Sequence, residues 1–154
     1  MASPLDQLIA IYDEGFDARA WHGPTLRGSL RGVTARQAAW RPGPRRHSIW
    51  EVAVHAAYWK YAVRRRLTGI ARGSFGLKGS NWFTVDGRAW KDDLRMLEDE
   101  HRRLREVIES LPAGALDKRV RGRDTVAFTV RGIAAHDLYH AGQIQLLKRL
   151  QKAG

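Results

Sequence analysis

Residues 133–147 read Ile-Ala-Ala-His-Asp-Leu-Tyr-His-Ala-Gly-Gln-Ile-Gln-Leu-Leu, and this stretch decides the fold class. Its apolar side chains recur with the period of a helix that buries one face. His136 and His140 lie in the same stripe as Ile133 and Ile144. Because residues four apart stand on one face of a helix, both imidazoles can reach one ion. The stretch therefore predicts a helix that presents two metal ligands to the protein interior.

A first helix is expected at the N-terminus. Ser3 is a suitable N-cap and Pro4 a suitable first helical residue. Apolar positions continue past Gly23-Pro24, where proline removes a backbone donor, so we expect a kinked helix that ends at Gly32.

Two more long helices lie between this one and the histidine helix. Each has an apolar stripe at helical spacing. The second long helix is predicted to run from a capping box at Ser48 and Glu51 to Gly69, and the third from Trp90 to Pro112. The histidine helix is predicted to run from Thr129 to Lys152. The segment 72–87 carries aromatic residues among its glycines, which predicts an ordered covering loop between helices two and three. A short extended pair is expected around Val120 and Val126.

Four long helices without a repeat predict an all-α four-helix bundle. The 154 residues suit a single domain, 1–154. The absence of cysteine excludes disulfides and thiolate ligands. No secretory leader and no membrane-crossing apolar run is present, so a cytoplasmic protein without membrane contact is expected. The net charge of +11 is spread along the chain and would favour anionic partners.

A transition metal generally needs a third protein ligand, and no His, Asp or Glu follows His140. His55, near the apolar stripe of the second long helix, is the best upstream candidate. Three neutral imidazoles suit zinc, nickel, copper or ferrous iron, with a position left open for water or substrate. Glu51 is expected to orient His55, and Trp59 to wall the same cleft.

Three segments resemble the DinB-like superfamily, also called DinB/YfiT-like metalloenzymes. They are Trp21-His22-Gly23-Pro24-Thr25-Leu26, His47-Ser48-Ile49-Trp50-Glu51 leading to His55, and His136-Asp137-Leu138-Tyr139-His140-Ala141-Gly142-Gln143-Ile144. The resemblance implies that His55, His136 and His140 are the metal ligands of an up-down-down-up bundle, often a homodimer, that binds nickel or zinc. It also implies an S-transferase or isomerase activity that uses a low-molecular-weight thiol on a small-molecule substrate.

The resemblance further suggests Tyr139 and Gln143 as ligand contacts or supports of the metal site. His22, at the predicted kink, is a candidate substrate contact, whereas His47 and His101 are expected to be structural.

Three alternatives remain open. His136-Asp137-Leu138-Tyr139-His140 could be a zincin-like motif of a metal-dependent hydrolase, with Asp137 as the base, although Asp is shorter than the usual Glu. The +11 charge could serve a nucleic-acid-binding bundle, but no nucleic-acid-binding motif appears, so this interpretation ranks below the enzyme. The metal could also be a structural staple without turnover.

Overall fold

The computed structural model describes all residues from 1 to 154, and it is mostly helical. Its elements are α1 (Pro4–Phe16), α2 (Leu26–Leu30), α3 (Ala35–Ala39), α4 (Ile49–Thr68), α5 (Trp90–Glu109), β1 (Arg119–Arg121), β2 (Asp124–Thr125) and α6 (Val126–Ala153). The all-α prediction is confirmed. The strands form a two-stranded antiparallel ribbon that leads into α6, close to the predicted extended pair.

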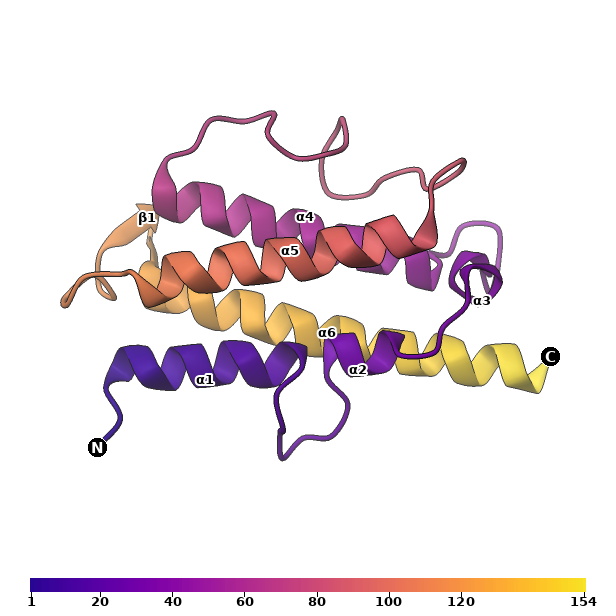
Figure 1. Ribbon diagram of the computed structural model, residues 1–154, viewed down its shortest axis with the longest axis horizontal. Helices are drawn as coiled ribbons and strands as arrows, with labels where there is room; N and C mark the ends of the chain where they lie inside the picture. Colours follow the sequence, from indigo (N-terminus) through magenta and orange to yellow (C-terminus); the bar gives the residue numbers. More distant parts are fainter.

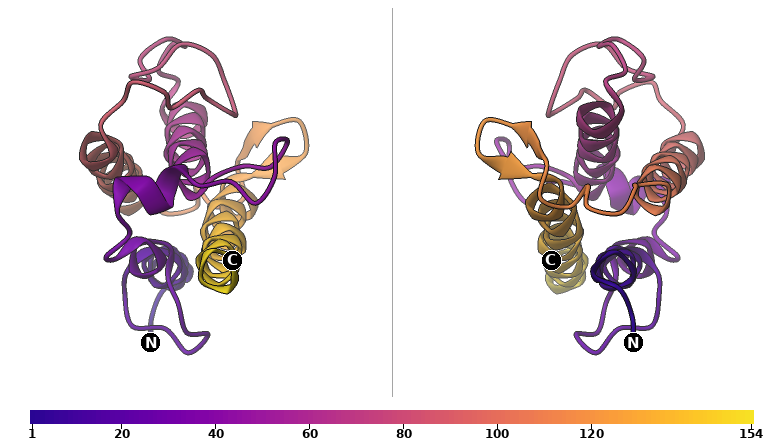
Figure 2. Two further views of the ribbon diagram at one scale, coloured as in Figure 1. Left: turned by 90° about the vertical axis from the view of Figure 1, so that its right-hand side faces the viewer. Right: turned by 90° about the vertical axis from the view of Figure 1, so that its left-hand side faces the viewer.

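The four long helices α1, α4, α5 and α6 lie lengthwise beside one another (Figure 1). In that view α1 and α6 run from left to right, and α4 and α5 run from right to left. The main contacts join α4 to α5, α1 to α6 and α4 to α6. Figure 2 shows the helices end-on, with the segment between α4 and α5 passing over the outside of α4. None of the helices is long and apolar enough to cross a lipid bilayer.

Helix ends follow local hydrogen bonding. The Ser48 hydroxyl accepts from the Glu51 amide while the Glu51 carboxylate accepts from the Ser48 amide, which is the predicted capping box. Gly69 ends α4 in the left-handed region with φ of 74°. The last helix begins earlier than predicted, because Thr125 and not Thr129 is its N-cap and accepts from the Phe128 amide.

The predicted kink in the first helix is instead a break. The helix α1 ends at Phe16, residues 17–25 are not helical, and α2 begins afresh with Thr25 as its N-cap. The proline therefore lies in a connection between two helices, where it interrupts no helical hydrogen bond. The helix α2 packs against α6 in continuation of the line of α1 (Figure 1).

The covering segment 69–89 is part of the core. Phe75, Phe83 and Val85 are buried in the same apolar cluster as the α4 residues beneath them. On the opposite side, Gly15 brings α1 close to α6, since a Cβ there would lie 3.0 Å from the Ala134 carbonyl oxygen. The covering segment thus packs on α4 and α1 packs on α6, the two helices that carry the predicted metal ligands.

Candidate metal centre

Three histidines meet between α4 and α6, as predicted. His55 projects from α4, and His136 and His140 project from successive turns of α6. The Nε2 atom of His136 lies 3.1 Å from Nε2 of His55 and 3.0 Å from Nε2 of His140. Together the three residues place one ring nitrogen each within 4.8 Å of one another. They form a three-histidine cluster that could hold a metal ion.

Hydrogen bonds outside the cluster decide which ring nitrogens carry protons. Nδ1 of His55 lies 2.8 Å from the main-chain oxygen of Asn81, and because a carbonyl only accepts, this Nδ1 donates. Nδ1 of His140 likewise donates to Oε1 of Gln143 at 2.7 Å. In the neutral rings the Nε2 atoms of His55 and His140 are therefore bare acceptors, both directed at Nε2 of His136.

Hydrogen bonds among the three histidines cannot satisfy all of their ring nitrogens. Nε2 of His136 can carry one proton at most, so it can donate to one of its two neighbours and leaves the other facing a lone pair. Nδ1 of His136 is buried without a hydrogen-bond partner. Nitrogens bound to one ion at about 2.1 Å are separated by roughly 3.0 Å at right angles, which matches the two separations measured from Nε2 of His136. The three residues therefore fit a divalent transition metal.

The electrostatics of the cluster favour neutral ligands. Burial lowers the pKa of His55 to about 4, against the hydrogen bond to Asn81, which raises it. Burial also lowers the pKa of His136 to about 3, assisted by the neighbouring His140 and His55. The pKa of His140 is lowered by burial as well. At neutral pH all three imidazoles are thus neutral, which is the form that binds a metal.

Two aromatic side chains from outside the long helices extend the wall of the site. The Trp82 ring stacks on His55 with ring centres 3.9 Å apart, and His47 stacks on the outer side of Trp82 at 3.5 Å. His47 is therefore part of the site wall, beyond the structural role expected from sequence. Asn81 is the only residue other than glycine with a positive φ, of 67°. This backbone turn aims its carbonyl at His55.

Trp59 of α4 lies beside two of the three histidines. Its ring lies edge-on to His55, with centres 6.3 Å apart, and to His136 at 6.2 Å. Its indole N–H donates to the side-chain oxygen of Asn81 at 3.0 Å. Trp59 therefore also anchors the residue that orients His55.

The other predicted site residues have varied positions. Gln143 orients His140 through the hydrogen bond described above, and Tyr139 is exposed with its ring edge-on to that of His140. Glu51 makes no hydrogen bond to His55, since its carboxylate accepts from Ser48 and Arg41. His22 is exposed, lies 3.2 Å from the Glu14 carbonyl and borders a different cavity.

Asp137 faces away from the metal site. Its carboxylate is fully buried and accepts from the fully buried Lys60 ammonium of α4 at 2.5 Å. The Lys60 nitrogen also lies 4.7 Å from the centre of the Tyr12 ring of α1. This pair ties α6 to α4 one residue away from His136, and it leaves Asp137 unable to reach a water molecule at the histidine cluster. The motif thus lacks the base that a zincin-like hydrolase needs.

A cavity of about 570 Å³ opens beside the cluster. Its lining combines the three histidines with basic residues of the 41–48 segment and apolar residues of α6, namely Arg45, Arg46, His47, Leu146, Leu147 and Leu150. The site therefore has room for a substrate next to the imidazoles, and its rim suits a molecule with both acidic and apolar parts.

The fold and the site define a class of mostly helical protein with a cluster of three histidines that could hold a metal ion. The sequence profile of the DinB superfamily matches residues 19–144. The chain belongs to the DinB superfamily, and the resemblance seen in its motifs is confirmed. No curated protein and no solved structure matches the chain.

Proposed function

We propose that this protein is a metal-dependent enzyme of the thiol S-transferase type, acting on a small-molecule substrate. His55, His136 and His140 would hold one nickel or zinc ion, and a low-molecular-weight thiol would serve as co-substrate. The observation that carries the proposal is the close spacing of the three Nε2 atoms, of which two are fixed as bare acceptors by Asn81 and Gln143. The proposal takes the four long helices as an up-down-down-up bundle, which their directions in Figure 1 support.

The donor set favours an anionic guest. A bound divalent ion would lower the pKa of a thiol at its open side and hold it as the thiolate. Because the three imidazoles are neutral and no carboxylate joins them, they leave the positive charge of the ion uncompensated. Arg45 and Arg46 at the cavity rim add further positive charge that would attract acidic groups of the thiol or its acceptor.

The remaining lining residues of the cavity would contact the two reactants, the thiol and its acceptor. Leu146, Leu147 and Leu150 offer apolar contacts for an electrophilic acceptor, and Trp82 closes the side above His55. These side chains exclude water from part of the cavity, which protects a thiolate from hydration and keeps the two reactants together. The competing hydrolase function has less support, because the carboxylate of Asp137 is held in a buried ion pair with Lys60.

The proposal also covers assembly and location. Leu146 and Leu150 are 58% and 42% exposed on α6 beside the cavity, and a partner subunit in a homodimer would cover them. A cytoplasmic location fits the use of a thiol that must be kept reduced. Light scattering of the purified protein tests the dimer: a mass of one chain at micromolar concentration contradicts it.

Elemental analysis tests the metal centre directly. Protein purified without a histidine tag should contain about one equivalent of a transition metal per chain, and His140→Ala should lose it. His22→Ala removes an exposed histidine outside the cluster and should keep the metal. A wild-type protein that takes up no stoichiometric metal when nickel and zinc are supplied would contradict the proposal at its base.

A thiol screen tests the reaction. The metal-loaded protein is incubated with glutathione, cysteine or mycothiol and an aryl chloride acceptor, and thioether formation is followed by absorbance. Turnover should disappear with a chelator and return with the correct ion. If the metal binds but no thiol reacts faster than in the His140→Ala variant, the S-transferase assignment is wrong while the metal centre stands.

A further inference from the structure

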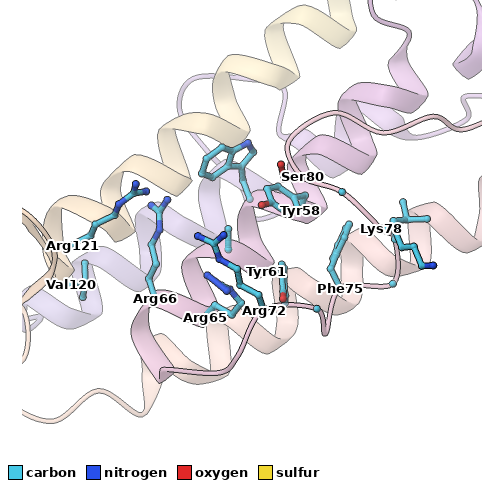
Figure 3. A pocket seen from close by; sticks show the side chains of 16 residues that line it. Tyr58, Tyr61, Arg65, Arg66, Arg72, Phe75, Lys78, Ser80, Val120 and Arg121 are labelled. Atoms are coloured by element: carbon cyan, nitrogen blue, oxygen red, sulfur yellow. The ribbon is translucent and has the colours of Figure 1, made fainter.

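A second and larger cavity, of about 980 Å³, lies on the other side of Trp59. It is bounded by the C-terminal half of α4, by residues 72–80 of the covering segment and by β1 (Figure 3). None of the three cluster histidines lines it. It is therefore a separate compartment that the proposed metal chemistry does not use.

The lining of this cavity is strongly basic. Five cationic residues from three segments line the cavity, and no Asp or Glu is among the lining residues; the cations are Arg65, Arg66, Arg72, Lys78 and Arg121. The ammonium of Lys78 is directed away from the arginines (Figure 3). A local concentration of positive charge around a concave surface attracts anions more strongly than the same charge spread over a convex one.

None of these five cations forms an ion pair within the protein. Some neighbouring arginines are paired: Arg64, the residue before the pocket cations of α4, makes a bidentate contact with Glu100, and Arg105 contacts Asp13. The cavity thus gathers cations that the fold leaves without a counter-charge.

The two α4 arginines are held toward the cavity by aromatic rings. The guanidinium of Arg66 lies 5.6 Å from the centre of the Trp59 ring, and that of Arg65 lies 5.8 Å from Tyr61. Burial, followed by the nearby charge of Arg121, lowers the pKa of Arg66. Figure 3 shows the guanidinium groups of Arg66 and Arg121 directed toward each other, and no ion pair joins either of them to Asp124. An anion between them would relieve the repulsion.

The covering segment adds neutral donors and an apolar surface. From Gly76 to Ser80 no main-chain N–H donates a hydrogen bond to another protein group. Tyr58 and Phe75, whose rings pack edge-on with centres 5.4 Å apart, give the cavity an aromatic side. The ligand that matches this lining has several anionic oxygens and one flat apolar group.

We propose that the cavity binds a phosphorylated small molecule that carries an aromatic ring, the chemical class of nucleoside di- and triphosphates. The phosphates would lie among Arg66, Arg72 and Arg121, where planar guanidinium groups can each donate two hydrogen bonds to phosphate oxygens. The ring would lie against the aromatic side formed by Tyr58 and Phe75.

Isothermal titration calorimetry with ATP, ADP, AMP and inorganic pyrophosphate tests this, in chelator-treated buffer so that no divalent ion bridges ligand and protein. Affinity should fall from ATP to AMP, and ADP should bind more tightly than pyrophosphate because, of these two diphosphates, only ADP carries a ring. The double variant Arg66→Ala with Arg121→Ala should weaken ATP binding about tenfold or more, since charge-assisted contacts are lost.

The matched control is Arg36→Ala with Arg131→Ala. These two arginines are exposed, line none of the cavities described and form no ion pair, so the control removes the same net charge while leaving the cavity intact. It should bind ATP within about twofold of wild type. His140→Ala should also bind ATP normally, which separates this cavity from the metal centre and lets either proposal fail without the other.

Three results would overturn the proposal. The first is no heat of binding for ATP at millimolar concentration. The second is an equal loss of affinity in the control and cavity variants, which would mean that net charge alone attracts the ligand. The third is a single-stranded oligonucleotide that binds far more tightly than ATP and is displaced by neither ATP nor pyrophosphate, which would identify a nucleic-acid surface.

Discussion

Asn81 and His55 are joined by a hydrogen bond of 2.8 Å from the imidazole Nδ1 to the main-chain oxygen of Asn81. The two residues lie 26 positions apart in the chain, and the acceptor belongs to the segment that covers α4. The bond fixes the proton of His55 on Nδ1 and leaves Nε2 free to bind a metal. The covering segment is therefore part of the metal site and not only a lid above it.

Trp59→Phe should weaken metal binding. The change removes the indole N–H that anchors the Asn81 side chain. The main-chain carbonyl of Asn81, which orients His55, is then held less firmly. Losses of such outer contacts typically reduce metal affinity about 10- to 100-fold, and we expect the lower end here because the main-chain contact itself remains. Competition with a chromophoric chelator measures the effect. Trp21→Phe, at a fully exposed tryptophan, is the control and should leave the affinity unchanged.

Gln143 offers a sharper test of ligand orientation. Gln143→Leu removes the acceptor of the His140 Nδ1 proton and should lower metal affinity about 10- to 100-fold. Gln143→Glu keeps an acceptor and should retain the affinity or increase it, because a carboxylate makes the imidazole more basic. The same chelator competition applies. Equal affinities for the Leu and Glu variants would show that this contact does not support the metal.

The buried pair of Lys60 and Asp137 predicts an asymmetric effect on stability. Lys60→Met leaves an uncompensated carboxylate in the core and should lower the free energy of unfolding by about 3 to 5 kcal/mol. Adding Asp137→Leu removes the orphaned charge and should recover most of the loss. Urea denaturation followed by circular dichroism measures both. A double variant no more stable than Lys60→Met alone would refute this account.

His101 predicts a pH dependence of stability. Its ring is stacked between Tyr12 and Phe16, and burial, with the charges of Lys60 and Arg105, lowers its pKa to about 2. An unfolded histidine titrates near about 6.5, so below that pH the unfolded chain holds a proton that the folded chain does not. This effect of His101 on the free energy of unfolding is absent above about pH 6.5. Below that pH it lowers the free energy of unfolding by up to about 1.4 kcal/mol for each further pH unit.

His101→Phe keeps the stacking and removes the titrating group. The variant should therefore lose stability less steeply than wild type when the pH is lowered from about 6.5 to about 4. Urea denaturation in the presence of a chelator, at several pH values in this range, compares the two slopes. Parallel slopes would mean that the folded protein protonates His101 as readily as the unfolded chain does.

The residues of the site were predictable because helical spacing is a local property. His136 and His140 share a face by the geometry of one helix, and His55 could be placed from the apolar stripe around it. The hydrogen-bond partner that orients His55 could not be predicted, because any residue can supply a main-chain carbonyl. Asn81 fills this role because its backbone adopts a positive φ. Glu51 was a reasonable candidate by spacing, but its capping role at Ser48 directs its carboxylate elsewhere.

The helical content of the chain followed from periodicity, whereas one junction did not. Continuous apolar spacing across Gly23-Pro24 predicted a kinked helix, but the chain leaves the helix at Phe16 and re-enters it after Thr25. Periodicity alone does not reveal a non-helical connection of this kind, because α1 and α2 both pack against α6. The pairing of Lys60 with Asp137 was also beyond sequence reasoning, since it joins residues 77 positions apart.

Trp59 lies between the three-histidine cluster and the basic cavity. One edge of its indole faces the imidazoles, and its other surroundings include the guanidinium that overlooks the basic cavity. A guest that shifts this ring from one chamber changes the shape of the other, and thermodynamic reciprocity requires the two occupants to alter each other's affinity by the same factor. If the proposed occupants displace its ring, Trp59 is the contact through which one site would influence the other.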